Sequence, residues 1–243
     1  MHPAVDALLH HPKIWRGDQL ACTEHPGLAT GHSALDRELP GAGWPVGGLT
    51  DLVARQPGSG ELRLLLPALA ALSQAGRQIV LIAPPHIPYA PAWQAAGVDL
   101  TRLSWLRADN ERDRLWALEQ TLREPSVGAV VGWLAGAPAD RLWRRLQLAA
   151  ETGGGSGFIL RGGTASTSSP VGLRLQVEPV AGGLSVQVLK RRGAPLARPV
   201  LIPHENRAGD QPLSFRFADA VASPLPASAT VTSVPERTLR VAA

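Results

Sequence analysis

From residue 48 onward, short runs of apolar residues alternate with longer segments in which apolar residues recur at helical spacing. The runs predict strands at 49–54, 78–83, 103–106, 128–134 and 158–160. The segments between them predict helices at 60–75, 89–96, 110–123 and 139–151. Near-continuous apolar strands separated by helices are typical of a mostly parallel sheet that helices flank on both faces. The sequence therefore predicts the α/β class.

The pattern changes after residue 160. Segment 162–170 is rich in Gly, Ser and Thr and predicts a loop. Apolar and polar residues alternate over 173–178 and 184–189, which predicts a C-terminal antiparallel hairpin, and 200–202 predicts a further short strand. We therefore expect three parts, which are an N-terminal helical segment (1–27), a core (28–207) and a tail (208–243) that composition predicts to be disordered.

Both terminal segments carry isolated large apolar side chains. In the first, Leu8, Leu9 and Trp15 fall on or near one helical face, and they could dock on the core or on a neighbouring subunit. In the tail, Phe215 and Phe217 are two of the three phenylalanines of the chain. These anchors are consistent with a segment that orders on a partner. Packing against the core would explain them equally well.

Segment 41–69 reads as a turn, a strand, a glycine-rich loop and a helix, which is the layout of a phosphate-binding loop. A working loop needs the pattern G-x-x-x-x-G-K-[ST]. With Gly60 as the second glycine, Arg55 stands at the first, Glu61 at the lysine and Leu62 at the hydroxyl position. A carboxylate cannot neutralise phosphate, although it suits a helix N-terminus and could occupy the anion site itself. We expect a degenerate loop (Gly58, Gly60, Glu61, Leu62) that binds no cofactor and no metal.

Two further positions argue against nucleotide hydrolysis. Such an enzyme needs a metal-holding aspartate at the end of an inner strand, but the strand at 128–134 ends in Gly132-Trp133 and then a leucine. The end of the second strand carries Pro84-Pro85, which cannot act as a general base. The chain also lacks a C-x-x-C pair, an H-E-x-x-H motif and a recognisable Ser-His-Asp spacing. We therefore expect that the protein is not an enzyme.

Composition fits one domain of ordinary size, with 243 residues of which 44% are hydrophobic and 18% charged. A single cysteine, Cys22, excludes an internal disulfide and suits a reducing compartment. The N-terminus does not read as a signal peptide, and the longest apolar run, 64–72, is too short to span a membrane. We expect a cytoplasmic protein without a membrane partner.

The net charge of +4 permits contact with nucleic acid but does not require it. Two basic clusters are candidate contacts for a phosphate or an acidic partner. They are Arg141, Arg144 and Arg145 in the helix at 139–151, and Lys190, Arg191 and Arg192 at the end of the hairpin. A solvated helix face and a solvated strand end are the alternatives.

The segment LATGHSALDRELPGAGWPVGGLTDLVARQPGSGE (28–61) resembles the beginning of a RecA-type core, and LSVQVLKRRGAPLARPVLI (184–202) resembles its closing strands. With a phosphate loop that lacks its lysine, residues 28–202 resemble the ImuA family of translesion-synthesis accessory proteins. The resemblance implies a RecA-like fold used for binding. It implies three partners. They are ImuB (which is an inactive Y-family polymerase homologue), an error-prone replicative-type DNA polymerase and, for some members, RecA. By the same resemblance, Lys190, Arg191 and Arg192 could cap a nucleotide site on RecA or bind DNA phosphate.

Residues 61–161 also resemble the SulA cell-division inhibitors, which block FtsZ polymerisation, in the phrases ELRLLLPALAAL, VVGWLAGA and GFILR. The additional N-terminal part, the basic hairpin and the greater length favour ImuA. The sequence thus predicts a non-enzymatic RecA-like adaptor in SOS-induced, error-prone translesion DNA synthesis. A SulA-like inhibitor that binds FtsZ is the alternative.

Overall fold

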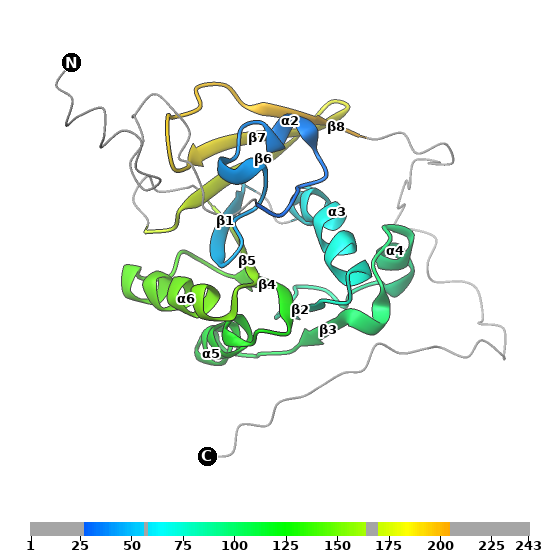
Figure 1. Cartoon of the computed structure of the whole chain (residues 1–243), viewed down its shortest axis with the longest axis vertical. Helices are drawn as coiled ribbons and strands as arrows, with labels where there is room; N and C mark the ends of the chain where they lie inside the picture. Colours follow the sequence, from blue (N-terminus) through cyan, green and yellow to red (C-terminus); the bar gives the residue numbers. More distant parts are fainter. Residues whose placement is uncertain (1–26, 56–57, 164–169, 205–243) are drawn as a thin grey trace, which may run out of the picture.

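The computed structural model describes residues 27–55, 58–163 and 170–204. Its eight strands form one sheet in the order β3-β2-β4-β5-β1-β6-β7-β8 (Figure 1). The strands are β1 (Gly48–Ala54), β2 (Gln78–Ile82), β3 (Leu103–Leu106), β4 (Val127–Leu134), β5 (Ser156–Gly162), β6 (Leu173–Val180), β7 (Gly183–Lys190) and β8 (Val200–Pro203). Pairing is parallel from β3 through β6, whereas β7 and β8 are added antiparallel. The mostly parallel α/β sheet with its C-terminal hairpin is confirmed.

The helices also fall close to their predicted positions. They are α2 (Ser33–Asp36), α3 (Glu61–Gln74), α4 (Ala90–Ala95), α5 (Glu111–Arg123) and α6 (Asp140–Gly153), with 3₁₀ turns η1 (Pro40–Ala42) and η2 (Leu100–Arg102). Helix α5 begins where it does because Asn110 Oδ1 accepts a hydrogen bond from the Asp113 N–H at 2.9 Å, which satisfies a donor of the first turn. Helix α2 and turn η1 have no counterpart among the predicted elements.

The core has one apolar layer on each face of the sheet. Alternate residues of β1 point to opposite layers, so Leu52 packs with Leu64 and Leu65 of α3, whereas Leu49 packs with the α5 and α6 side. Figure 1 shows α5 and α6 together on one side of the sheet and α3 on the other. Trp44 and Phe158 meet edge to face in the α3 layer, with ring centroids 5.4 Å apart.

The two terminal segments fall outside the described residues, and with them lie the predicted docking positions Leu8, Leu9, Trp15, Phe215 and Phe217. Within the described ranges, no helix is long and apolar enough to cross a membrane.

Candidate functional site at the carboxyl edge of the sheet

The glycine-rich loop joins the end of β1 to the start of α3, as the sequence predicts. Gly60 precedes the helix with φ +100°, a left-handed conformation that favours glycine. A Cβ atom on Gly60 would also lie 2.6 Å from Leu184 Cδ2 of β7. The loop therefore delivers Glu61 to the first turn of α3, where the side chain is only 7% exposed.

The Glu61 carboxylate is hydrogen-bonded to the backbone of the loop that precedes it. Its Oε1 accepts a hydrogen bond from the Gly58 N–H at 2.8 Å. Loop amides at a helix N-terminus are the groups that would hold a phosphate, so the side chain fills part of the position that an anion would take. The other oxygen, Oε2, is buried and has no hydrogen-bond partner among the described residues.

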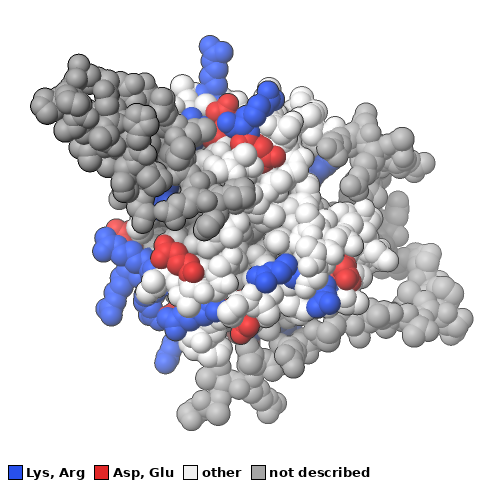
Figure 2. All heavy atoms as spheres, in the orientation of Figure 1, with Lys and Arg blue, Asp and Glu red and all other residues white. Residues whose placement is uncertain are grey.

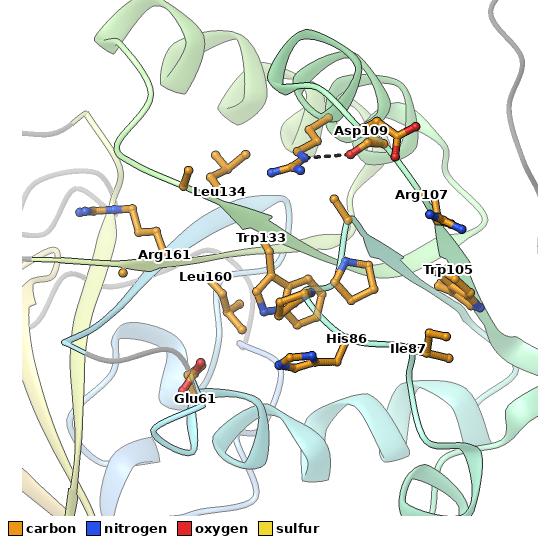
Figure 3. A pocket seen from close by; sticks show the side chains of 17 residues that line it. Glu61, His86, Ile87, Trp105, Arg107, Asp109, Trp133, Leu134, Leu160 and Arg161 are labelled. Carbon is orange, nitrogen blue, oxygen red and sulfur yellow. Dashed lines mark hydrogen bonds between the residues drawn. The ribbon is translucent and has the colours of Figure 1, made fainter.

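A cavity of about 530 Å³ opens beside Glu61 (Figure 3). Its walls come from the carboxyl ends of β3, β4 and β5 and from the loop after β2, and they include His86, Trp105, Trp133 and Leu160. In open α/β sheets, ligands bind at this edge. The positions predicted for a general base and a metal ligand, Pro84-Pro85 and Trp133, line the cavity without supplying either chemistry. In the described part of the chain, no group of three His, Cys, Asp or Glu side chains could hold a metal ion.

An ion cluster buried behind the cavity was not found by sequence reasoning. Asp51 in the middle of β1 is fully buried and accepts from Arg161 Nε at 2.8 Å, from Arg161 Nη2 at 2.9 Å and from Arg174 Nε at 2.7 Å. Arg161 also lines the cavity, but Figure 3 shows its guanidinium turned away from Trp133. The one available signal was an aspartate inside the apolar strand sequence GLTDLVA.

The arginine cluster of α6 divides into two roles. Arg145 pairs with the buried Glu119 of α5, which also accepts from Arg123 Nη2 at 2.7 Å. Arg145 therefore fastens α6 to α5 although its side chain is 54% exposed, and Arg141 and Arg144 are exposed as well. Basic groups gather on this side of the molecule, over the position of α5 and α6 (Figure 2). All three arginines are exposed on α6, and their contact with a partner stays a prediction.

The basic hairpin is divided in the same way. Arg191 Nη1 donates to the backbone oxygen of Glu38 and to Glu38 Oε2, the latter at 3.1 Å, and Arg191 Nε donates to the Ala194 oxygen at 2.7 Å. Its side chain is 7% exposed. Arg191 therefore ties the end of β7 to the segment between α2 and η1, and its contact with a partner protein stays a prediction. Arg192 is exposed and Lys190 is half-buried.

The glycine-rich loop and most of the residues that line the cavity lie in a region of the chain that matches a known protein family. The model of the family described as cell division inhibitor SulA matches residues 47–157. The cell division inhibitor SulA of Klebsiella aerogenes is 32% identical over 142 residues, which cover 57% of this chain and 79% of that protein. The chain belongs to the SulA family.

A second relative of this SulA-family chain is the protein ImuA of Caulobacter vibrioides (strain NA1000 / CB15N), which is 32% identical over 143 residues. The match covers 57% of the chain and 58% of the length of that ImuA. The crystal structure of SulA from Pseudomonas aeruginosa aligns with a TM-score of 0.42 and 28% identity, covering 49% of this chain and 100% of that one. Both resemblances read from the sequence, to ImuA and to SulA, are confirmed.

Proposed function

We propose that this chain is a non-enzymatic adaptor with a RecA-like core, which serves SOS-induced, error-prone translesion DNA synthesis through protein–protein contacts. The observation that carries the proposal is the hydrogen bond from the Gly58 N–H to Glu61 Oε1 at 2.8 Å. It places a protein carboxylate where a nucleotide phosphate would need to sit. The relationship to ImuA supports the setting, a response to DNA damage.

The extent of the sheet supports an adaptor that is larger than the SulA unit. The family match ends at residue 157, inside β5, yet the same sheet continues through β6, β7 and β8 to Pro203. These three strands add surface beyond the matched region. The proposed partners are an ImuB-like inactive Y-family polymerase homologue, an error-prone replicative-type DNA polymerase and RecA, and the proposed location is the cytoplasm. Direct contact with DNA is compatible with this function but is not required for it.

We expect no micromolar affinity for ATP and no ATP hydrolysis. The Gly58 N–H already donates to Glu61, and Leu62 stands where a phosphate loop has the hydroxyl residue that holds Mg²⁺. Among the described residues, no group of three His, Cys, Asp or Glu side chains could hold a metal ion. Fluorescence anisotropy with a labelled ATP analogue and Mg²⁺ checks the binding, and release of inorganic phosphate checks the hydrolysis. A saturable titration in the micromolar range would refute the degenerate loop.

A cell-division inhibitor is the second candidate function. It is favoured by the SulA family match over residues 47–157 and by the 79% coverage of the Klebsiella aerogenes SulA. An inhibitor of this kind would bind FtsZ and stop septation, whereas an adaptor would leave division unchanged when overproduced.

Overexpression combined with affinity capture separates the two candidates. For the adaptor we expect cells of normal length and capture of the ImuB-like protein encoded in the same genome, with no enrichment of FtsZ. Filamentous cells together with capture of FtsZ would select the inhibitor instead. An unrelated protein expressed at the same level is the control for the effect of overexpression on growth.

A further inference from the structure

We propose that the cavity at the carboxyl edge of the sheet receives the guanidinium group of an arginine side chain presented by a partner protein. Glu61 would be the counter-ion and Trp133 the stacking surface. The inference goes beyond the adaptor function. It rests on that function in one respect only, which is that a partner protein supplies the arginine.

The first argument is the state of the Glu61 carboxylate. The residue is 7% exposed and lines the cavity, its Oε1 already accepts from the Gly58 N–H, and its Oε2 is buried without a partner in the described structure. A buried carboxylate oxygen without a donor is costly. A ligand that carries N–H donors and positive charge would relieve this cost, and an anion would increase it.

The second argument is the wall opposite the carboxylate. The cavity is lined by the half-buried indoles of Trp105 and Trp133 and by Leu160, with His86 at the side of Glu61 (Figure 3). A planar guanidinium stacks on aromatic faces and is more weakly hydrated than an ammonium group. The combination of an indole wall and a buried carboxylate therefore favours arginine over lysine.

The basic residues in the lining do not make the cavity an anion site. Arg161 donates two hydrogen bonds to Asp51, and Arg114 Nε donates to the Ala108 oxygen at 3.0 Å. Both guanidiniums thus have acceptors within the chain, and Arg107, the third arginine of the lining, is not without a partner either. A phosphate would also lie against Glu61, at a loop whose Gly58 amide is already engaged. Repulsion from that buried carboxylate opposes anion binding.

The rim indicates that the arginine belongs to a polypeptide. The loop after β2 presents Ile87, which lines the cavity, and nearby Tyr89, and these side chains are 80% and 65% exposed. Exposed apolar side chains that gather beside a pocket are typical of protein-binding sites. A segment with apolar residues next to its arginine could cover this rim while the guanidinium enters the cavity.

The test uses the full chain with ¹⁵N label and follows the indole N–H signals of Trp105 and Trp133, assigned by single Trp→Phe replacements. The probes are the peptide Ac-Leu-Arg-Leu-NH₂ and its citrulline counterpart, which has the same shape without the charge. We expect the arginine peptide to shift the Trp133 signal and to bind at least about tenfold more tightly than the citrulline peptide. In Glu61→Gln this preference should fall to about twofold or less.

The control variant is Asp109→Asn, which removes an exposed carboxylate from the same cavity lining. It should change the affinity by no more than about threefold, because exposed charges are screened by solvent. Equal binding of the two peptides to the unmodified chain, or an arginine preference that survives Glu61→Gln, would overturn the inference. So would shifts of the same signals by inorganic phosphate. Failure to capture an ImuB-like protein would count against the adaptor function alone, since the peptide titration does not depend on it.

Discussion

Replacing Asp51 by alanine is expected to lower the free energy of unfolding by about 3–5 kcal/mol, because it removes the buried carboxylate to which two buried guanidiniums donate. Asp51 is 0% exposed, and the side chains of Arg161 and Arg174 are 3% and 2% exposed. None of the three can recover its hydration without opening the sheet. The loss would be a large part of the stability of an ordinary domain.

The measurement is the midpoint of urea unfolding, followed by tryptophan fluorescence. The matched control is Glu178→Ala, which removes the carboxylate of an ion pair at the surface. Glu178 Oε1 lies 3.0 Å from Arg55 Nε, and the side chains of Arg55 and Glu178 are 74% and 40% exposed. That pair should contribute less than about 1 kcal/mol. Similar midpoint shifts for the two variants would show that the Asp51 cluster is not stabilising in the way we expect.

A triple replacement distinguishes an unpaired charge from a lost contact. The cost of Asp51→Ala could come from the buried positive charges that lose this carboxylate. In that case, Asp51→Leu combined with Arg161→Met and Arg174→Met should recover most of the lost stability, because apolar side chains of similar volume can replace a buried ion cluster. If the triple variant remains as unstable as Asp51→Ala, packing at this position matters more than charge.

Local patterns predicted the elements because strands, helices and caps are set by neighbouring residues. The apolar run of β4 and the Asn110 cap of α5 are examples, and the Glu61 substitution was readable from loop spacing alone. Segment 28–47 was different. Leu35, Leu39 and Trp44 are almost fully buried there, yet α2 and η1 are too short to show a period.

The missed side-chain partners are far apart in the chain. Asp51 is separated by 110 residues from Arg161 and by 123 from Arg174, and Arg191 by 153 from Glu38. Asp51 meets Arg161 and Arg174 because β1 lies between β5 and β6 in the sheet, an order that no local pattern specifies. For the same reason, no local pattern indicated that Arg191 is paired with Glu38. Long-range pairing decides which arginines of a basic cluster remain available to a partner.

A methyl group added at Gly153, the last residue of α6, should lower the free energy of unfolding by about 1–3 kcal/mol. In a helix, alanine would ordinarily be the better residue by up to about 1 kcal/mol. Here a Cβ atom would lie 2.1 Å from the backbone oxygen of Leu122 and 2.9 Å from the Arg123 carbonyl carbon of α5. Because both atoms belong to the backbone, no rotamer change relieves the overlap, and α6 must move away from α5.

Urea unfolding of Gly153→Ala checks this sign directly. Gly136→Ala, at a glycine where a Cβ would meet nothing within 4 Å, is the control and should change the stability by less than about 0.5 kcal/mol. A higher midpoint for Gly153→Ala would mean that helix propensity outweighs the close approach. A lower midpoint would show that glycine is required here so that the Glu119–Arg145 pair and the buried Trp143 and Leu146 can hold the two helices together.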